Sequence, residues 1–298
     1  MKKIRFQFLV LVILQINLIF SQETNASFGL EENDTNYISF GQIDTSYLNR
    51  DGEAPLPSVF SYRNKISVQV FDQGFVPACV GYAIASAVTI RMNLYCNVNC
   101  SCKKTQPPFS AAYLYNQISG GKLCGISLAR TLDTLEKQGI CPERIFQNDR
   151  YSASKQPDRA IRDTAGKFNF WKAERIFFLP DELQNNDKRY NLMLQLLKVY
   201  IFKSKPIIVG LRCPEDFKTF KGKVYKPGIL PINANHAALV IGYDDETKTI
   251  EILNSFGEDW GDGGFASIGY EDFCRMARYG YVTRLNGGIG DTCEAKQK

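Results

Sequence analysis

The sequence is poor in residues on which several kinds of chemistry depend. It has one histidine, His236, among 298 residues, which argues against a histidine-rich metal site. It has no basic stripe with interleaved aromatic residues, so nucleic acid is not an expected partner. Beyond residue 20 no apolar run is long enough to span a bilayer. We therefore expect no metal, no organic cofactor and no stable membrane span in the mature chain.

What the sequence does have begins with an amino-terminal leader. Residues 1–20 read MKKIRFQFLVLVILQINLIF, in which three positive charges precede an apolar stretch. We interpret residues 1–21 as a secretory signal peptide, because no positive stop-transfer flank follows; an uncleaved anchor is the alternative. Cleavage near Ser21 would remove the three positive charges and lower the formal net charge from +5 to +2. The mature chain is expected to be secreted, or periplasmic or otherwise extracytoplasmic.

All nine cysteines follow the leader. If Cys79 is a free nucleophile, the others suit up to four disulfides in an oxidising compartment, with a pairing that the sequence does not determine. These cysteines are Cys96, Cys100, Cys102, Cys124, Cys141, Cys213, Cys274 and Cys293. The close spacing of the first three would also suit zinc, but the single histidine and the oxidising destination argue against it.

The periodicity of the chain changes near its middle. Residues 22–55 are polar and acidic, and we interpret them as an extended arm or a short pro-segment. A structured domain is predicted for residues 56–298, with helical patterns over about 72–185 and strand patterns over about 186–285. This order predicts an α+β fold of two lobes packed face to face, one helical and one mostly of strands, with a cleft between them.

Several elements are predicted within these lobes. Helices are expected from Cys79, over 109–118, after a Ser127 cap up to Gly139, and over YNLMLQLLKVYIFKS. Strands are expected at IIVGL, HAALVIGYDD, KTIEILNSF and GFASIGY, with a turn at 244–248. Residues 142–185 show no regular pattern, and Trp171, Phe177 and Phe178 are expected to anchor them in the core.

The stretch DQGFVPACVGYAIASAVTIRMNLY holds the first functional signal, because Cys79 stands where a loop becomes an apolar helix. The amino end of a helix favours an anion, so the thiolate of Cys79 should be stabilised there. Gln73, six residues earlier, carries an amide that could donate to a developing oxyanion. The alternative is that Cys79 is a buried apolar residue or half of a disulfide.

His236 and Asn254 provide the other half of a nucleophilic site. His236 opens a predicted strand, where its imidazole could take the Cys79 proton and later protonate a leaving amine. Asn254 ends the next strand and could orient the ring through one nitrogen, with Phe256 covering that hydrogen bond. A structural histidine and a turn asparagine are the alternative interpretations.

Taken in order, the segments LPSVFSYR, DQGFVPACVGYAIA, FSAAYLY, NHAALVIGYDD and NSFGEDWGDGGFASI resemble the signature blocks of papain-like cysteine peptidases. The resemblance implies a papain-like fold, in which a helical lobe and an antiparallel sheet or barrel lobe have the active site in the cleft between them. It also implies Cys79 as nucleophile, His236 as base, Asn254 as orienting residue and Gln73 in the oxyanion hole. It also implies that Gly125 lies near a glycine strand that pairs with the substrate backbone.

The chain departs from the family pattern at several points. Pro77 and Ala78 precede the nucleophile and Val80 follows it, where the family usually has Cys-Gly-Ser/Ala and Trp. The 22–55 arm is too short to resemble the family's helical inhibitory propeptide, so zymogen control is not expected. The resemblance favours an exported cysteine peptidase acting on peptides or polypeptides. The alternatives are a non-catalytic papain-like module that binds polypeptide and an acyl or amide transferase with the same Cys-His-Asn set.

Overall fold

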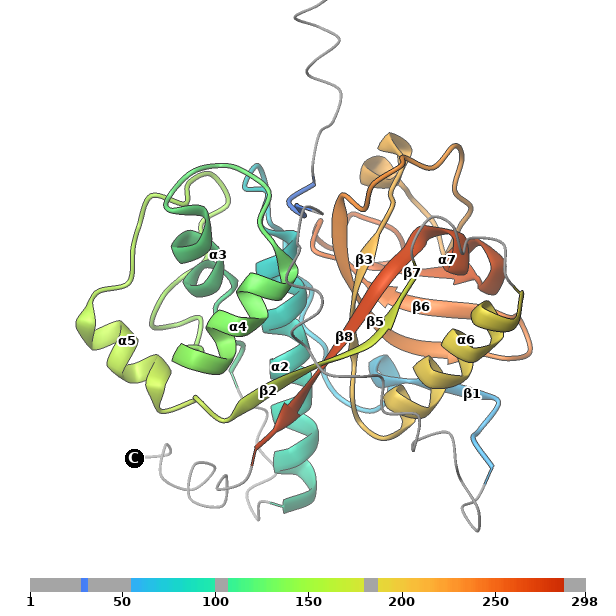
Figure 1. Cartoon of the computed structure of the whole chain (residues 1–298), viewed down its shortest axis with the longest axis horizontal. Coiled ribbons are helices and arrows are strands. Elements are labelled where there is room, and N and C mark those ends of the chain that lie inside the picture. Colours follow the sequence, from blue (N-terminus) through green and yellow to red (C-terminus); the bar gives the residue numbers. More distant parts are fainter. Residues whose placement is uncertain (1–27, 32–54, 100–106, 180–186, 287–298) are drawn as a thin grey trace, which may run out of the picture.

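The computed structural model describes residues 28–31, 55–99, 107–179 and 187–286. It confirms an α+β architecture in which a helical part and a sheet part lie side by side (Figure 1). The helices are α2 (Cys79–Asn99), α3 (Ala111–Ser119), α4 (Leu128–Gln138), α5 (Arg159–Gly166), α6 (Asp187–Phe202) and α7 (Tyr270–Met276), with 3-10 turns η3 (Tyr62–Asn64) and η5 (Glu215–Thr219). The predicted signal peptide, most of the 22–55 arm, Cys100, Cys102 and Cys293 lie outside the described residues.

Local sequence signals define the ends of the helices in the first half. The hydroxyl of Ser127 accepts from the Arg130 N–H at 3.0 Å and begins α4, and Gly139, with a φ of +75°, ends it. Ala129, Leu132 and Leu135 are buried, as their spacing predicts. α2 begins at Cys79 and is buried on nearly every side, which explains its almost uniformly apolar sequence.

The strands form one eight-stranded sheet in the order β2-β8-β3-β5-β6-β7-β4, with β1 also paired to β5. Their bounds are β1 (Val59–Ser61), β2 (Trp171–Phe178), β3 (Ile207–Leu211), β4 (Val224–Tyr225), β5 (His236–Asp244), β6 (Thr249–Leu253), β7 (Phe265–Gly269) and β8 (Ala277–Leu285). All pairs are antiparallel except the short β4–β7 pair. β5 is central, and all but the last of its residues are buried.

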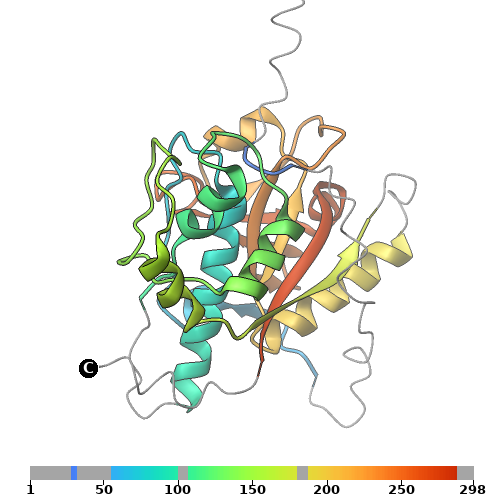
Figure 2. The same cartoon turned by 60° about the vertical axis from the view of Figure 1, so that its left-hand side comes forward.

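Helices cover the sheet on two sides (Figures 1 and 2). α2 packs against β5, β3 and β8 from the side of the helical part, while α6 packs against β5 and β3 from the outer side. The contact of α2 with β5 matters for function, because it brings the start of α2 to the start of β5. Cys79 and His236 are the first residues of these two elements.

The expectation of an irregular segment at 142–185 is wrong. This part of the chain contains α5 and β2, and β2 pairs along its length with β8. The sheet thus takes a strand from residues assigned to the helical lobe. Trp171 and Phe177 are buried as expected, but Phe178 is 37% exposed because it points to the other face of the strand. An alternating pattern is absent here, because charged residues fall on both faces of β2.

The described part of the chain holds no helix that is both long and apolar enough to cross a membrane. Within the same residues Cys124, Cys141, Cys213 and Cys274 are thiols without a disulfide partner. The predicted disulfides therefore find no support in this part of the structure.

Candidate active site

Cys79 lies at the amino end of α2 and is completely buried. Its Sγ accepts a hydrogen bond from the backbone N–H of Ala237 at 3.4 Å. Ala237 directly follows His236 in β5, so the thiol lies beside the start of the strand that carries the only imidazole of the chain. The structure thus brings together two residues that the sequence separates by more than half the chain.

Asn254 holds the ring of His236. Nε2 of His236 and Oδ1 of Asn254 are 2.7 Å apart, and the same Oδ1 accepts from the Ser255 N–H at 2.9 Å. An amide oxygen only accepts, so the neutral ring carries its proton on Nε2 and keeps a lone pair on Nδ1. That Nδ1 is buried and has no hydrogen-bond partner among the described residues. The ring is therefore in the tautomer that a general base for a nearby thiol requires.

Aromatic rings enclose the imidazole. Phe256 lies 4.9 Å from the His236 ring centroid, as predicted for a residue that shields the His–Asn hydrogen bond. Phe217, in η5, lies 5.5 Å away on another side. Phe217 was not predicted as a site residue, because nothing in its local pattern distinguishes it from an ordinary core residue.

Gln73 is fixed beside this pair by Ser255. The Ser255 hydroxyl donates to Oε1 of Gln73 at 2.7 Å, and the Gln73 N–H donates to the Ser255 carbonyl at 2.8 Å. These contacts turn the amide nitrogen toward the loop before Cys79, where Nε2 donates to the Val76 carbonyl at 3.0 Å. Ser255 is a second residue that was not predicted, and its position directly after Asn254 is the signal that could have indicated it.

A short segment of the amino-terminal arm lies over these residues. Nε2 of Gln73 also donates to the carbonyl of Phe28 at 3.1 Å, and the Phe28 ring lies edge-on to His236 at 5.6 Å. The same segment pairs with the backbone of Ile126, which directly follows Gly125. The backbone bonds anticipated near Gly125 are thus made one residue later, and to the chain's own arm.

Burial decides the charge state of the covered site. It raises the pKa of the Cys79 thiol to about 12, although hydrogen bonds from the Ala237 and Val80 backbone act in the opposite direction. It also lowers the pKa of His236 to about 4, against the effect of the Asn254 hydrogen bond. In the covered cleft both groups are therefore neutral at neutral pH. The stabilised thiolate expected from the helix terminus alone is not favoured here, because desolvation outweighs the helix dipole.

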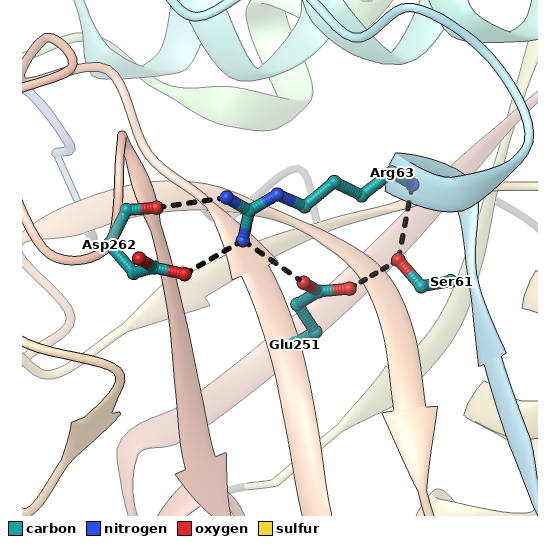
Figure 3. Close-up of polar contacts among 4 residues, drawn as sticks. All are labelled: Ser61, Arg63, Glu251 and Asp262. Carbon is teal, nitrogen blue, oxygen red and sulfur yellow. Dashed lines mark hydrogen bonds and ion pairs between the residues drawn. The ribbon is translucent and has the colours of Figure 1, made fainter.

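Arg63, in η3 near the start of the domain, binds the loop between β6 and β7 (Figure 3). Its guanidinium bonds Oδ2 of Asp262 at 3.0 Å, lies 4.0 Å from Glu251, and stacks over the Phe265 ring at 4.2 Å. Ser61 donates to the other carboxylate oxygen of Glu251. The loop that starts at Asn254 is thus held at its far end by a network of partly exposed charges.

A hollow of about 630 Å³ lies elsewhere, between α6, α7 and the turn after β5. Tyr190, Asp245, Tyr270 and Arg275 line it, and none of the predicted site residues does. The carboxylate of Asp245 already accepts hydrogen bonds from Lys198 and from the Tyr270 hydroxyl. The hollow therefore offers no alternative centre for the Cys79 chemistry.

Comparison with known proteins gives a consistent result. Residues 57–283 match the model of the papain family cysteine proteases. The chain is 23% identical over 211 residues to an uncharacterized peptidase C1-like protein of Acanthamoeba polyphaga mimivirus, covering 67% of this chain and 64% of that protein. It is 30% identical over 97 residues to falcipain-3 of Plasmodium falciparum, covering 27% of this chain and 20% of that protein. It thus spans less than two thirds of the length of these relatives.

Solved structures of cysteine proteases share the fold. Xylellain, a cysteine protease from Xylella fastidiosa, superposes with a TM-score of 0.68 at 20% identity, covering 88% of this chain and 97% of that one. Procathepsin B S9 from Trypanosoma congolense gives a TM-score of 0.63 at 16% identity, with 88% of each chain covered. At these identities the likeness concerns the fold.

Proposed function

Because this chain belongs to the papain family of cysteine proteases, we propose that it is an exported cysteine peptidase that hydrolyses peptide bonds through Cys79. Its substrates are peptides or polypeptides bound between the helical part and the sheet. The observation that carries the proposal is the hydrogen bond between His236, the first residue of β5, and Asn254. Nδ1 of His236 has no hydrogen-bond partner among the described residues, and the next residue of β5, Ala237, contacts the Cys79 sulfur through its backbone N–H.

The proposed reaction uses Cys79, His236 and Gln73. With a substrate carbonyl at the amino end of α2, the Cys79 thiol gives its proton to Nδ1 of His236 and the sulfur attacks the carbonyl carbon. The negative charge on the carbonyl oxygen is stabilised by Nε2 of Gln73 and by the Cys79 N–H. His236 then protonates the leaving amine, and a thioester to Cys79 remains. Water hydrolyses the thioester with His236 as base, which returns the thiol.

Asn254 and Ser255 act as positioning residues in this scheme. Asn254 keeps the His236 proton on Nε2, and Ser255 turns the Gln73 amide so that its nitrogen faces the carbonyl site. Gly125 is proposed to adjoin the substrate backbone, since the next residue, Ile126, presents both its N–H and its carbonyl to an extended segment.

The test compares the full chain with Cys79→Ala on a library of denatured proteins, with new amino termini identified by mass spectrometry at several pH values. The Cys79→Ala protein should unfold at the same denaturant concentration and produce no cleavage above background. Cleavage by the variant equal to that of the wild type would overturn the proposal. Incorporation of an added amine into the products would instead indicate the acyl or amide transferase, and tight peptide binding without turnover would indicate a non-catalytic module.

Export is proposed from the leader at residues 1–21, which lies outside the described residues. Expression with this leader should yield a protein outside the cytoplasm whose sequence begins near Gln22. Recovery of the uncleaved chain in the membrane fraction would indicate an anchor instead.

A further inference from the structure

The chain between η5 and β5 gathers positive charge and exposed apolar side chains on one part of the surface. Figure 1 shows this stretch in amber and orange at the top of the sheet part, at the far end from α6. Residues 217–235 carry four lysines and no acidic residue. The lysines, all exposed, are Lys218, Lys221, Lys223 and Lys226. Val224 is 51%, Ile229 95% and Ile232 77% exposed, and no large hydrophobic side chain of the described residues is more exposed than Ile229.

The other side of this stretch is packed on the core. Tyr225 of β4 is buried, and its ring lies 5.0 Å from that of Phe217 and 5.1 Å from that of Phe220, measured between ring centroids. Because side chains alternate along a strand, Val224 and Lys226 lie on the opposite, exposed side. The stretch is therefore apolar toward the core and carries both lysine and aliphatic side chains toward solvent.

The loop after β4 holds its two isoleucines away from the core. Pro227 and Pro231 restrict the backbone of this loop, and Leu230 is partly buried against the core. With Leu230 on the core, Ile229 and Ile232 remain in water. An isoleucine exposed to this degree gains free energy when an apolar phase covers it. The loop thus carries apolar side chains that the described part of the chain does not cover.

The charges of the lysines are largely available to a partner. Lys221 donates to the backbone carbonyl of Asp259, which leaves its charge without a counter-ion. Lys218, Lys223 and Lys226 form no ion pair within the described residues. The nearest acidic residues in the sequence, at positions 215 and 216, lie in η5, and the second of them accepts from the Tyr225 hydroxyl at 3.0 Å. The exposed side of the stretch is therefore positive.

The residue types favour a lipid surface over a protein or a nucleic acid. Protein interfaces are enriched in arginine, tyrosine and tryptophan and depleted in lysine, whereas every cation of this stretch is a lysine. The aromatic rings of the stretch pack in the core, so none is free to stack on a nucleobase. A lysine reaches the phosphate groups of anionic lipids while its aliphatic stem lies along the apolar layer. Aliphatic side chains on the same surface insert below the headgroups.

We propose that residues 218–232 form a lipid-docking surface that binds the protein to an anionic phospholipid bilayer, with Ile229 and Ile232 among the acyl chains and the lysines on the phosphate groups. The inference goes beyond the proposed function and does not depend on it, because binding needs no turnover. Phe217, directly before this surface, lies 5.5 Å from the ring of His236. Docking would therefore hold the candidate active site close to the bilayer.

The experiment measures the partition of the mature chain, from Gln22 onward, onto vesicles by flotation. The mature chain is used because the apolar leader would itself bind lipid. Vesicles of phosphatidylcholine and phosphatidylglycerol in equal parts should bind the wild type at least about tenfold more tightly than vesicles of phosphatidylcholine alone, since several lysines contribute. High salt should weaken binding to the anionic vesicles, because it screens exposed charges.

Two substitutions separate the electrostatic part of binding from the apolar part. Lys226→Gln should lower the partition coefficient on anionic vesicles by about fivefold. Ile229→Ser should lower it by about fivefold as well, if about half of the side chain enters the bilayer. The matched control is Lys188→Gln with Leu192→Ser, which removes an exposed lysine and an exposed aliphatic side chain from α6. It should bind like the wild type, and all variants should unfold at the same urea concentration.

Equal vesicle binding by the wild type and by a variant with both Lys226→Gln and Ile229→Ser would overturn the lipid-docking surface. Loss of binding with Lys226→Gln but not with Ile229→Ser would overturn insertion and leave a purely electrostatic contact. A wild type that ignores vesicles but forms a dimer that Ile229→Ser dissociates would make this surface an interface between two copies of the chain. Cys79→Ala should bind vesicles like the wild type, so the peptidase proposal and this one fail separately.

Discussion

Lowering the pH should leave His236 uncharged far below the pH at which an exposed histidine becomes protonated. His236 is completely buried among aromatic rings, and this burial lowers its pKa from 6.5 to about 4. The Asn254 hydrogen bond acts in the opposite direction but is weaker than the desolvation. Because the chain has no other histidine, a single imidazole reports the result.

The lowered pKa of His236 makes the stability of the folded protein depend on pH. A pKa that is lower in the folded protein favours the folded state above pH 6.5, and this stabilisation is lost as the pH falls toward about 4. The complete loss amounts to about 3 kcal/mol of unfolding free energy, of which about 2 kcal/mol is already lost at pH 5. Acid should therefore lower the free energy of unfolding by a measurable fraction of the total stability of a domain.

The assay is an NMR titration of the imidazole carbon-bound protons, together with urea unfolding at pH 7 and pH 5. The titration midpoint should lie well below 6. His236→Gln should remove this component of the pH dependence of unfolding, while the component from carboxylates remains. A midpoint at or above 6.5 would refute the reasoning, because it would mean that burial does not disfavour the imidazolium in the covered site.

Three further outcomes are expected. Asn254→Ala should lower kcat by about tenfold to a hundredfold and the unfolding free energy by about 1–3 kcal/mol, because the His236 ring loses the acceptor that fixes its tautomer and buried donors lose their partner; unchanged kcat would contradict that role. Arg63→Met should lower the unfolding free energy by about 1 kcal/mol in urea titrations and leave kcat within about twofold, since both partners of its ion pair with Asp262 are more than a third exposed. Gly210→Ala should destabilise by about 1–3 kcal/mol, because a Cβ would lie 2.3 Å from the Tyr279 ring, and a thermal midpoint equal to the wild type would show that the ring moves freely.

Much of the local structure follows from the sequence, because its causes lie within a few residues. The Ser127 cap and the Gly139 stop define α4 at both ends. The apolar run after Pro77 predicts a buried helix that starts at Cys79, and the segments HAALVIGYDD and KTIEILNSF, rich in apolar residues, predict β5 and β6. The order of the signature blocks indicates the family, and the match over residues 57–283 confirms it.

Pairings between distant residues depend on the tertiary structure. β2 has no clear strand pattern, and its partner β8 lies about a hundred residues away, so only the folded sheet defines it. The Gln73–Ser255 bonds likewise join two loops that no local rule connects. For this reason Ser255 and Phe217 were not predicted to lie beside Cys79, His236 and Asn254, the site residues that the sequence predicts.

The residue types and their local settings define which groups could do the chemistry: a cysteine at a helix terminus, one histidine, an asparagine and a glutamine. The charge state of these groups depends on how the chain packs. Packing α2 on β5 buries the thiol and the imidazole together, and the segment at Phe28 closes what remains of the site, so desolvation keeps both groups neutral. Burial depends on everything that surrounds a group, including an arm some fifty residues away in the chain, and no local pattern encodes it.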